Sequence, residues 1–239
     1  MKAIIESFLD KITEKNNLVR ITGLFGIFGM FLVFLTDYKI LYLPLSAKEY
    51  TTFRSALAHS SSDIFFYSRL AVFAVPFVIL GLYHFYLTLA KANKLLARVA
   101  VGIYVFAYLN SAFYYAFLAY VMNAAKVLVP HELTLSYFMR HIYFLLQLHY
   151  YFGIIAGSIL LFLGITFFKG KNYPNWYIYV NPLYLIFVFR IVLPLATPPV
   201  YSGFFLNVSF NLVMLITMML STFFMWKKSW QDIMPDIVK

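Results

Sequence analysis

Cysteine is absent from this chain of 239 residues, and charged side chains make up only 12% of it. Without cysteine there is no disulfide framework, no thiolate nucleophile and no thiolate metal site. With so few charges, a water-soluble globule would have too little polar surface to cover itself, because soluble domains carry about 25% charged residues. Apolar residues make up 63% of the sequence, which excludes disorder as well. The composition therefore indicates a chain whose solvent is a lipid bilayer.

The short motifs of several enzyme classes are also missing. The sequence has no Walker or dinucleotide-binding loop, no HExxH zinc motif and no GxSxG nucleophile motif. No lysine lies in the core of a long apolar run, which argues against a retinal-type Schiff base. We therefore expect neither a metal site nor a cofactor.

Long apolar runs dominate what is there. A helical span needs about 20 mainly apolar residues. Six runs qualify: 18–36, 64–90, 96–122, 138–168, 176–196 and 203–226. Backbone polar groups in hydrocarbon must be satisfied within their own segment, so these runs predict helices. We expect an all-α, polytopic membrane bundle over residues 18–226, without a soluble domain.

The basic residues between these runs indicate the orientation. Twelve lie on the side of the two chain ends and four on the opposite side. Because cytoplasmic loops carry the excess of Lys and Arg, both termini are predicted to be cytoplasmic. Residues 1–17 place five apolar side chains on one face and predict an amphipathic interfacial helix, with a solvated leader as the alternative. Residues 227–239 are expected to form a cytoplasmic tail.

Three arginines fall inside predicted spans, where each costs roughly 2.5–3.5 kcal/mol at a helix centre. Arg69, Arg140 and Arg190 all lie toward the outer side of the predicted topology, as do Asp37 and Asp63. One hypothesis is an outward-facing pocket that holds an anionic or phosphate-bearing headgroup. The alternative is that the arginines extend to the interface, or form structural pairs with the aspartates.

Polar and aromatic residues also form a narrow stripe on three of the predicted spans. The members are Arg140, Gln147, Tyr151 and Ser158; Tyr104, Tyr108, Ser111 and Tyr115; and Asn207, Asn211, Met214, Met218 and Ser221. Tyrosine suits the wall of a cavity for an amphiphile, because it combines an apolar ring with one hydroxyl. We predict one interior in which the arginines hold a headgroup, Tyr104, Tyr108, Tyr115 and Tyr151 line the apolar part, and Gln147, Asn207 and Asn211 orient the ligand. Ordinary interhelical hydrogen bonding is the alternative.

Two further classes of function stay open. A lipid-modifying enzyme would use Asp37, Asp63, Glu132 and His149 as acid-base candidates, and at least two of them would have to share a cavity. A small transporter or channel would need a polar path to the cytoplasmic side. Polar residues are sparse there, which makes a continuous path the weaker hypothesis.

The expected partners are membrane lipids or an amphiphilic small molecule. The net charge of +10 is carried by residues between apolar runs, which indicates a membrane surface and no nucleic acid. Small residues at Gly23, Gly26, Gly153 and Gly157 predict close helix packing. The same faces could form a homo-oligomer, or the chain could be an interaction subunit of a membrane complex.

The stretch 169–211 carries a family resemblance. A basic turn leads to Tyr173-Pro174-Asn175-Trp176, and Asn181-Pro182 opens a span. Asn207 and Asn211 lie in the last span, and the glycine-rich first span ends in Asp37. Together these features resemble an uncharacterised family of six-span prokaryotic integral membrane proteins. The resemblance implies six spans and a place in the cytoplasmic (cell inner) membrane, and it implies no activity.

Overall fold

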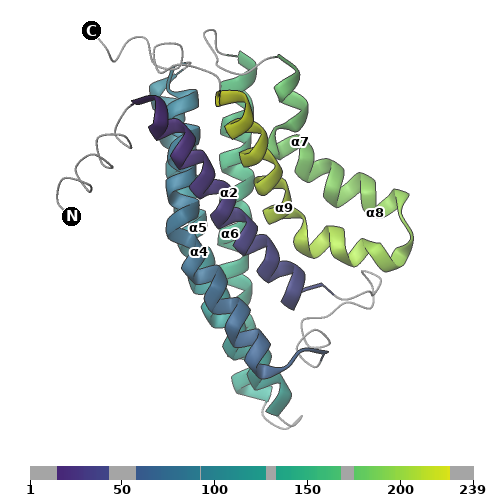
Figure 1. Cartoon of the computed structure of the whole chain (residues 1–239). Coiled ribbons are helices and arrows are strands. Elements are labelled where there is room, and N and C mark those ends of the chain that lie inside the picture. Colours follow the sequence, from purple (N-terminus) through teal and green to yellow (C-terminus); the bar gives the residue numbers. More distant parts are fainter. Residues whose placement is uncertain (1–14, 43–57, 92, 128–132, 168–174, 227–239) are drawn as a thin grey trace, which may run out of the picture.

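The computed structural model describes residues 15–42, 58–91, 93–127, 133–167 and 175–226, and the regular elements within these ranges are all helical (Figure 1). Five helices are long and apolar enough to cross a bilayer. They are α2 (Lys15–Ile40), α4 (Ser61–Leu89), α5 (Lys94–Val127), α6 (Leu133–Phe167) and α9 (Pro199–Met225). The predicted all-α class is thus confirmed, and five of the six predicted spans coincide with long apolar helices. The predicted interfacial helix and tail fall largely or wholly on residues 1–14 and 227–239, which lie outside the described ranges.

The predicted span 176–196 is helical but is not one continuous α-helix. It consists of a 3₁₀ helix η1 (Asn175–Val180), α7 (Pro182–Phe187), a π-helical segment η2 (Val188–Val192) and α8 (Leu193–Ala196). Asn181 caps α7 by accepting a hydrogen bond from the Leu183 backbone N–H at 2.8 Å. Pro194 has no N–H to offer the carbonyl four residues earlier, so the α-helical hydrogen-bond pattern cannot continue through this point.

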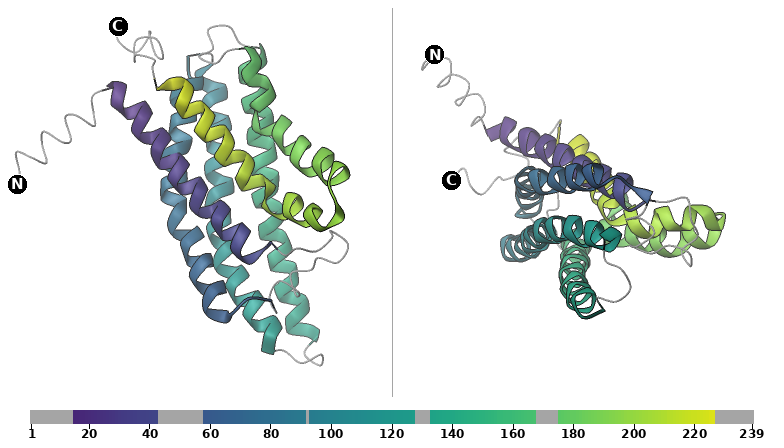
Figure 2. Two further views of the ribbon diagram at one scale, coloured as in Figure 1. Left: turned by 45° about the vertical axis from the view of Figure 1, so that its right-hand side comes forward. Right: turned by 90° about the horizontal axis from the view of Figure 1, so that it is seen from below.

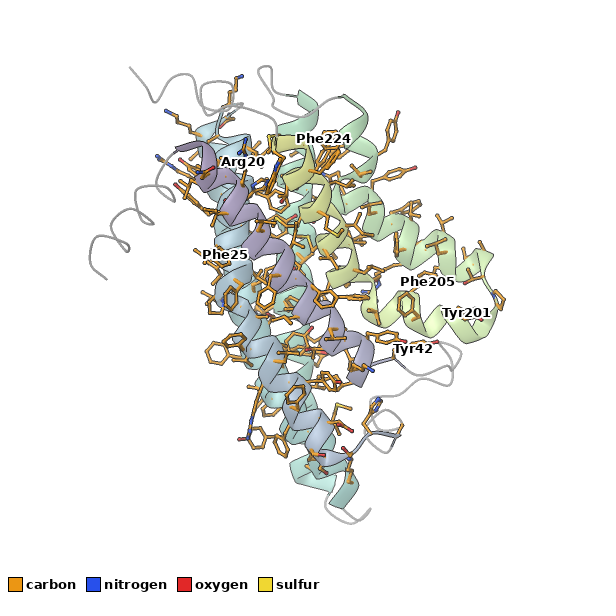
Figure 3. All side chains as sticks on the ribbon, viewed as in Figure 1. Arg20, Phe25, Tyr42, Tyr201, Phe205 and Phe224 are labelled. Atoms are coloured by element: carbon orange, nitrogen blue, oxygen red, sulfur yellow. The ribbon has the colours of Figure 1, made fainter. Side chains whose placement is uncertain are left out.

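The long helices pack in a simple order. The α2 helix contacts α4 and α9, and α5 contacts α4 and α6. Figure 2 shows the bundle from two further directions. The start of α2 and the end of α9 lie at the same end of the bundle (Figure 1). There the Nε of Arg20, labelled in Figure 3, donates to the backbone carbonyl of Trp226 at 2.9 Å.

Glycine allows the closest of these helix contacts. Gly26 of α2 faces Gly81 of α4, and a Cβ built on Gly26 would lie 2.7 Å from the Gly81 Cα. Gly29 meets Val78 of α4, while Gly23 meets Thr222 of α9. The predicted packing role of the first-span glycines therefore has a structural basis, since their missing side chains let two backbones approach.

Large apolar side chains cover the outside of the bundle (Figure 3). Phe113, Phe152 and Phe223, on three different helices, are 67%, 69% and 71% exposed. Exposed apolar area of this extent is rare on soluble monomers. Its position on long apolar helices indicates a surface that faces lipid.

Candidate functional site

A buried carboxylate joins four helices near the end of α2. Asp37 is 3% exposed. Tyr115 of α5 donates its hydroxyl to Asp37 Oδ1 at 2.6 Å, and the Asn211 amide of α9 donates to Oδ2 at 2.6 Å. Tyr150 of α6 donates to the Asn211 side-chain carbonyl at 2.6 Å. These four residues, the Asp37 network, fasten α2, α5, α6 and α9 to one another.

The predicted stripes on α5, α6 and α9 do meet in the interior. Tyr104 and Ser158 share a hydrogen bond of 2.8 Å, and the Asn211 amide reaches the Tyr115 hydroxyl at 3.0 Å. Tyr108 is fully buried and packs on Tyr150 with ring centroids 5.8 Å apart. Tyr104 and Tyr115 thus form interhelical hydrogen bonds and Tyr108 packs on a ring, whereas the sequence analysis had assigned all three to the wall of a ligand cavity.

Sequence reasoning missed Tyr150, which lies one position outside the predicted stripe of α6. The helix-packing residues would have marked its face. Gly153 and Gly157 follow Tyr150 at helical spacing, and Gly153 packs against Ala107 of α5 while Gly157 packs against the Tyr104 ring. The face of α6 that carries these glycines is thus the face that meets α5, and Tyr150 shares it.

Arg190 forms a second cluster, on the π-helical segment η2. Its guanidinium carbon lies 4.5 Å from the Phe210 ring centroid and 5.7 Å from that of Tyr151. The two rings stack on each other, with centroids 4.5 Å apart. The Gln147 amide lies 3.4 Å from the Tyr151 hydroxyl. Arg190, Gln147 and Tyr151 were all predicted site residues, whereas Phe210 was not; we call these four the Arg190 cluster.

The Arg190 cluster and the Asp37 network contain residues that are neighbours in the sequence. Tyr151 follows Tyr150, and Phe210 precedes Asn211. The centroids of the two tyrosine rings lie 5.3 Å apart. Arg190 is half-buried, and no described carboxylate forms an ion pair with it. Hydrogen bonds, and no ion pair within the described ranges, hold Asp37.

Arg69 lies elsewhere, at a pocket of about 220 Å³ between α4 and α5. The pocket is lined by Phe65, Ser68, Arg69 and Val72 of α4 and by Ala116, Ala119 and Tyr120 of α5. The Arg69 guanidinium carbon lies 5.7 Å from the Phe65 ring centroid, and the side chain is exposed. Arg69 and Arg190 share no contact residue, so the structure places these two predicted headgroup ligands in separate clusters.

The remaining site candidates are spread over the molecule. Asp63 is exposed and accepts a hydrogen bond of 2.6 Å from Ser60 at the start of α4. His149 is exposed, with Nδ1 2.7 Å from the Leu145 carbonyl. Asp63, His149 and the buried Asp37 share no hydrogen-bond partner, whereas the hypothesis of a lipid-modifying enzyme required at least two of the candidates at one cavity. Glu132 and the side chains of Arg140 and Asn207 lie outside the described part of the structure.

The glycines predicted to form a homo-oligomer interface contact other helices of the same chain. Gly23 and Gly26 pack against α9 and α4, and Gly153 and Gly157 pack against α5. The oligomeric state stays a prediction, and these four positions contribute to intramolecular packing.

Five long apolar helices with aromatic side chains on their outer faces indicate a multi-pass helical membrane protein. The chain belongs to the family of unknown function DUF6796, which matches residues 12–229. Membership of a family without an assigned activity was predicted and is confirmed. No curated protein and no solved structure matches the chain.

Proposed function

We propose that this chain is a six-span protein of the prokaryotic cytoplasmic membrane that binds an anionic amphiphile through Arg190. Counting residues 175–196 as the fifth span gives six spans, and the distribution of basic residues then places both termini in the cytoplasm. In this proposal Arg190 contacts the anionic group of the ligand. Gln147 and Tyr151 orient that group, and the Phe210 ring packs against the guanidinium.

The observation that carries the proposal is a half-buried guanidinium without a carboxylate partner among the described residues. A cation at membrane depth costs roughly 2.5–3.5 kcal/mol on insertion scales. Stacking of the guanidinium on an aromatic ring stabilises it by only about 0.5–2 kcal/mol. The two terms do not cancel, so an anion at this position would stabilise the protein, and a planar guanidinium is suited to bind carboxylate or phosphate in a bidentate manner.

The broken helix supports the same position. Pro194 leaves the carbonyl of Arg190, four residues earlier, without its α-helical donor. The backbone at residues 188–192 forms a wider π turn, in which the Leu193 N–H donates to the Val188 carbonyl five residues earlier. Irregular backbone at membrane depth is tolerated where it faces protein or a wet site, and π-helical turns are frequent at functional sites.

Removing the guanidinium tests the proposal. Arg190→Gln should weaken oleate binding about tenfold or more, because a hydrogen bond to a charged group contributes about 1.5–3 kcal/mol. The measurement is native mass spectrometry of the full chain in a non-ionic detergent, titrated separately with oleate, phosphatidylglycerol and inorganic phosphate. We expect both amphiphiles to bind the parent chain and inorganic phosphate not to bind, because phosphate has no apolar part.

Arg98→Gln is the matched control, because Arg98 is exposed near the start of α5 and belongs to neither cluster. It should leave oleate affinity unchanged. Equal affinity of the parent chain and Arg190→Gln for oleate would overturn the proposal. Binding of inorganic phosphate as strong as that of oleate would contradict the amphiphile part of it.

Transport of the same kind of ligand is the second candidate function. Interrupted membrane helices commonly form the substrate sites of transporters, and η1 to α8 form such an interrupted segment. Proteoliposomes loaded with a pH-sensitive dye distinguish the two functions, since flux of oleate above that of protein-free vesicles favours transport. Binding without flux favours a binding protein.

A further inference from the structure

Ser68 carries a buried hydroxyl that no described residue pairs with. The residue is 1% exposed, and its Oγ has no hydrogen-bond partner among the residues that the structure describes. Ser68 lines the pocket between α4 and α5, and the other lining residues with polar side chains are Arg69 and Tyr120. Leaving a buried hydroxyl unpaired costs about 1–3 kcal/mol. A turn of the Ser68 side chain toward the pocket would let an oxygen acceptor of a bound ligand satisfy this hydroxyl.

The length of α4 fits a position of the pocket at one membrane boundary. From Arg69 to Leu89, the last residue of the helix, a rise of 1.5 Å per residue gives about 30 Å. This is the thickness of the hydrocarbon core of a bilayer. If Leu89 lies at one boundary, Arg69 lies at the other, at the level of phosphate and glycerol groups. Exposed Tyr120 beside Arg69 fits the aromatic belt of the same level.

Charge and size then select the occupant. No described carboxylate forms an ion pair with Arg69, and the nearby Asp63 bonds to Ser60 instead. The pocket volume of about 220 Å³ is several times the ~30 Å³ share of one water and far below that of a whole phospholipid. It therefore suits a phosphate-glycerol headgroup whose acyl chains stay outside, along exposed apolar side chains on the bilayer side of the pocket such as Phe73 and Phe113.

We propose that the pocket between α4 and α5 binds one anionic phospholipid of the surrounding bilayer, with its phosphate on Arg69 and an ester or headgroup oxygen accepting from Ser68. Phe65 and Val72 contact the glycerol region, and Tyr120 closes the rim. This site shares no residue with the Arg190 cluster. It therefore stands or fails independently of the ligand proposed there.

The test is the retention of phosphatidylglycerol by the full chain in a non-ionic detergent, measured by native mass spectrometry in an Arg190→Gln background. That background removes the contribution of the Arg190 cluster. Adding Arg69→Gln should lower the affinity for phosphatidylglycerol about tenfold, because it removes a charge-assisted, bidentate contact. Ser68→Ala should lower the affinity about threefold, because it removes one neutral hydrogen bond. Phosphatidylcholine, which carries no net charge, should bind more weakly than phosphatidylglycerol.

Lys39→Gln is the matched control. Lys39 is also an exposed cation near an aromatic ring, 5.9 Å from the Tyr38 centroid, but it does not line the pocket between α4 and α5. Its replacement should leave retention unchanged. Ala116→Phe fills the pocket from its exposed rim while keeping Arg69, and it should reduce retention as strongly as Arg69→Gln. Equal losses of phosphatidylglycerol retention in Lys39→Gln and Arg69→Gln would mean that general surface charge, and not this pocket, holds the lipid. Full retention by Ala116→Phe would show that the pocket is not the site. Either result overturns the proposal.

Discussion

Alanine in place of Gly81 is expected to lower the free energy of unfolding by about 1–3 kcal/mol. The same substitution at Gly102 should raise it by up to about 1 kcal/mol, since alanine is the better helix former. At Gly81 the new Cβ would meet the backbone of Gly26, which cannot move aside as the end of a side chain could. The α2 and α4 helices would have to separate. At Gly102, on the exposed face of α5, the new Cβ would meet nothing within 4 Å.

The measurement is equilibrium unfolding in mixed detergent, followed by circular dichroism, for the two single variants and the parent chain. Gly26→Ala should repeat the effect of Gly81→Ala, because each Cβ would meet the other glycine. The double variant should differ from the sum of the two, since both act on one contact. Shifts of Gly81→Ala and Gly102→Ala in the same direction would contradict the close approach of α2 and α4.

The sequence predicts helices well in this chain because lipid imposes a simple rule on backbone hydrogen bonds. It predicts the break in the fifth segment less well. An apolar run from 176 to 196 reads like the other runs, since hydropathy counts side chains and says nothing of backbone donors. Pro194 was the residue in the sequence that indicated a break. The position and kind of the break, a π turn that begins at Val188, are known only from the structure.

The arginines show a different limit. Sequence and topology place Arg69, Arg140 and Arg190 at a similar depth, but depth does not say which helices are neighbours. Arg69 lies between α4 and α5, and Arg190 packs on α6 and α9. The polar stripes were a better guide, because a stripe gives the angular face of a helix as well as its depth. Tyr115 and Asn211 do meet.

Leucine in place of Asn211 is expected to lower the free energy of unfolding by about 3 kcal/mol, the upper part of the range for buried groups left without partners. The average interhelical hydrogen bond in a membrane contributes only about 0.6 kcal/mol, since the unfolded chain also finds partners. Asn211 differs from that average because it serves three residues at once. Its loss removes one of the two donors of Asp37 and the acceptor of Tyr150.

Asn110→Leu is the control, because within the described residues the half-buried Asn110 only donates one solvent-exposed hydrogen bond, to the Phe106 carbonyl of its own helix. It should change the unfolding free energy by less than about 0.5 kcal/mol, as surface substitutions usually do. The same unfolding assay in mixed detergent compares the two variants. Similar losses for Asn110→Leu and Asn211→Leu would mean that the change from amide to leucine matters and the Asp37 network does not.

A double-mutant cycle separates the carboxylate from simple packing. Asp37→Leu removes the acceptor of Tyr115 and Asn211, and Asn211→Leu leaves Asp37 with one donor. In the double variant neither the carboxylate nor the amide remains. The cost of leaving one of them buried without its partner is therefore absent. We expect the double variant to be more stable than the sum of the single effects by about 1–3 kcal/mol, as for residues in one hydrogen-bond network. Additive losses would mean that Asp37 and Asn211 stabilise the bundle separately, and that the four helices are not held through one buried charge.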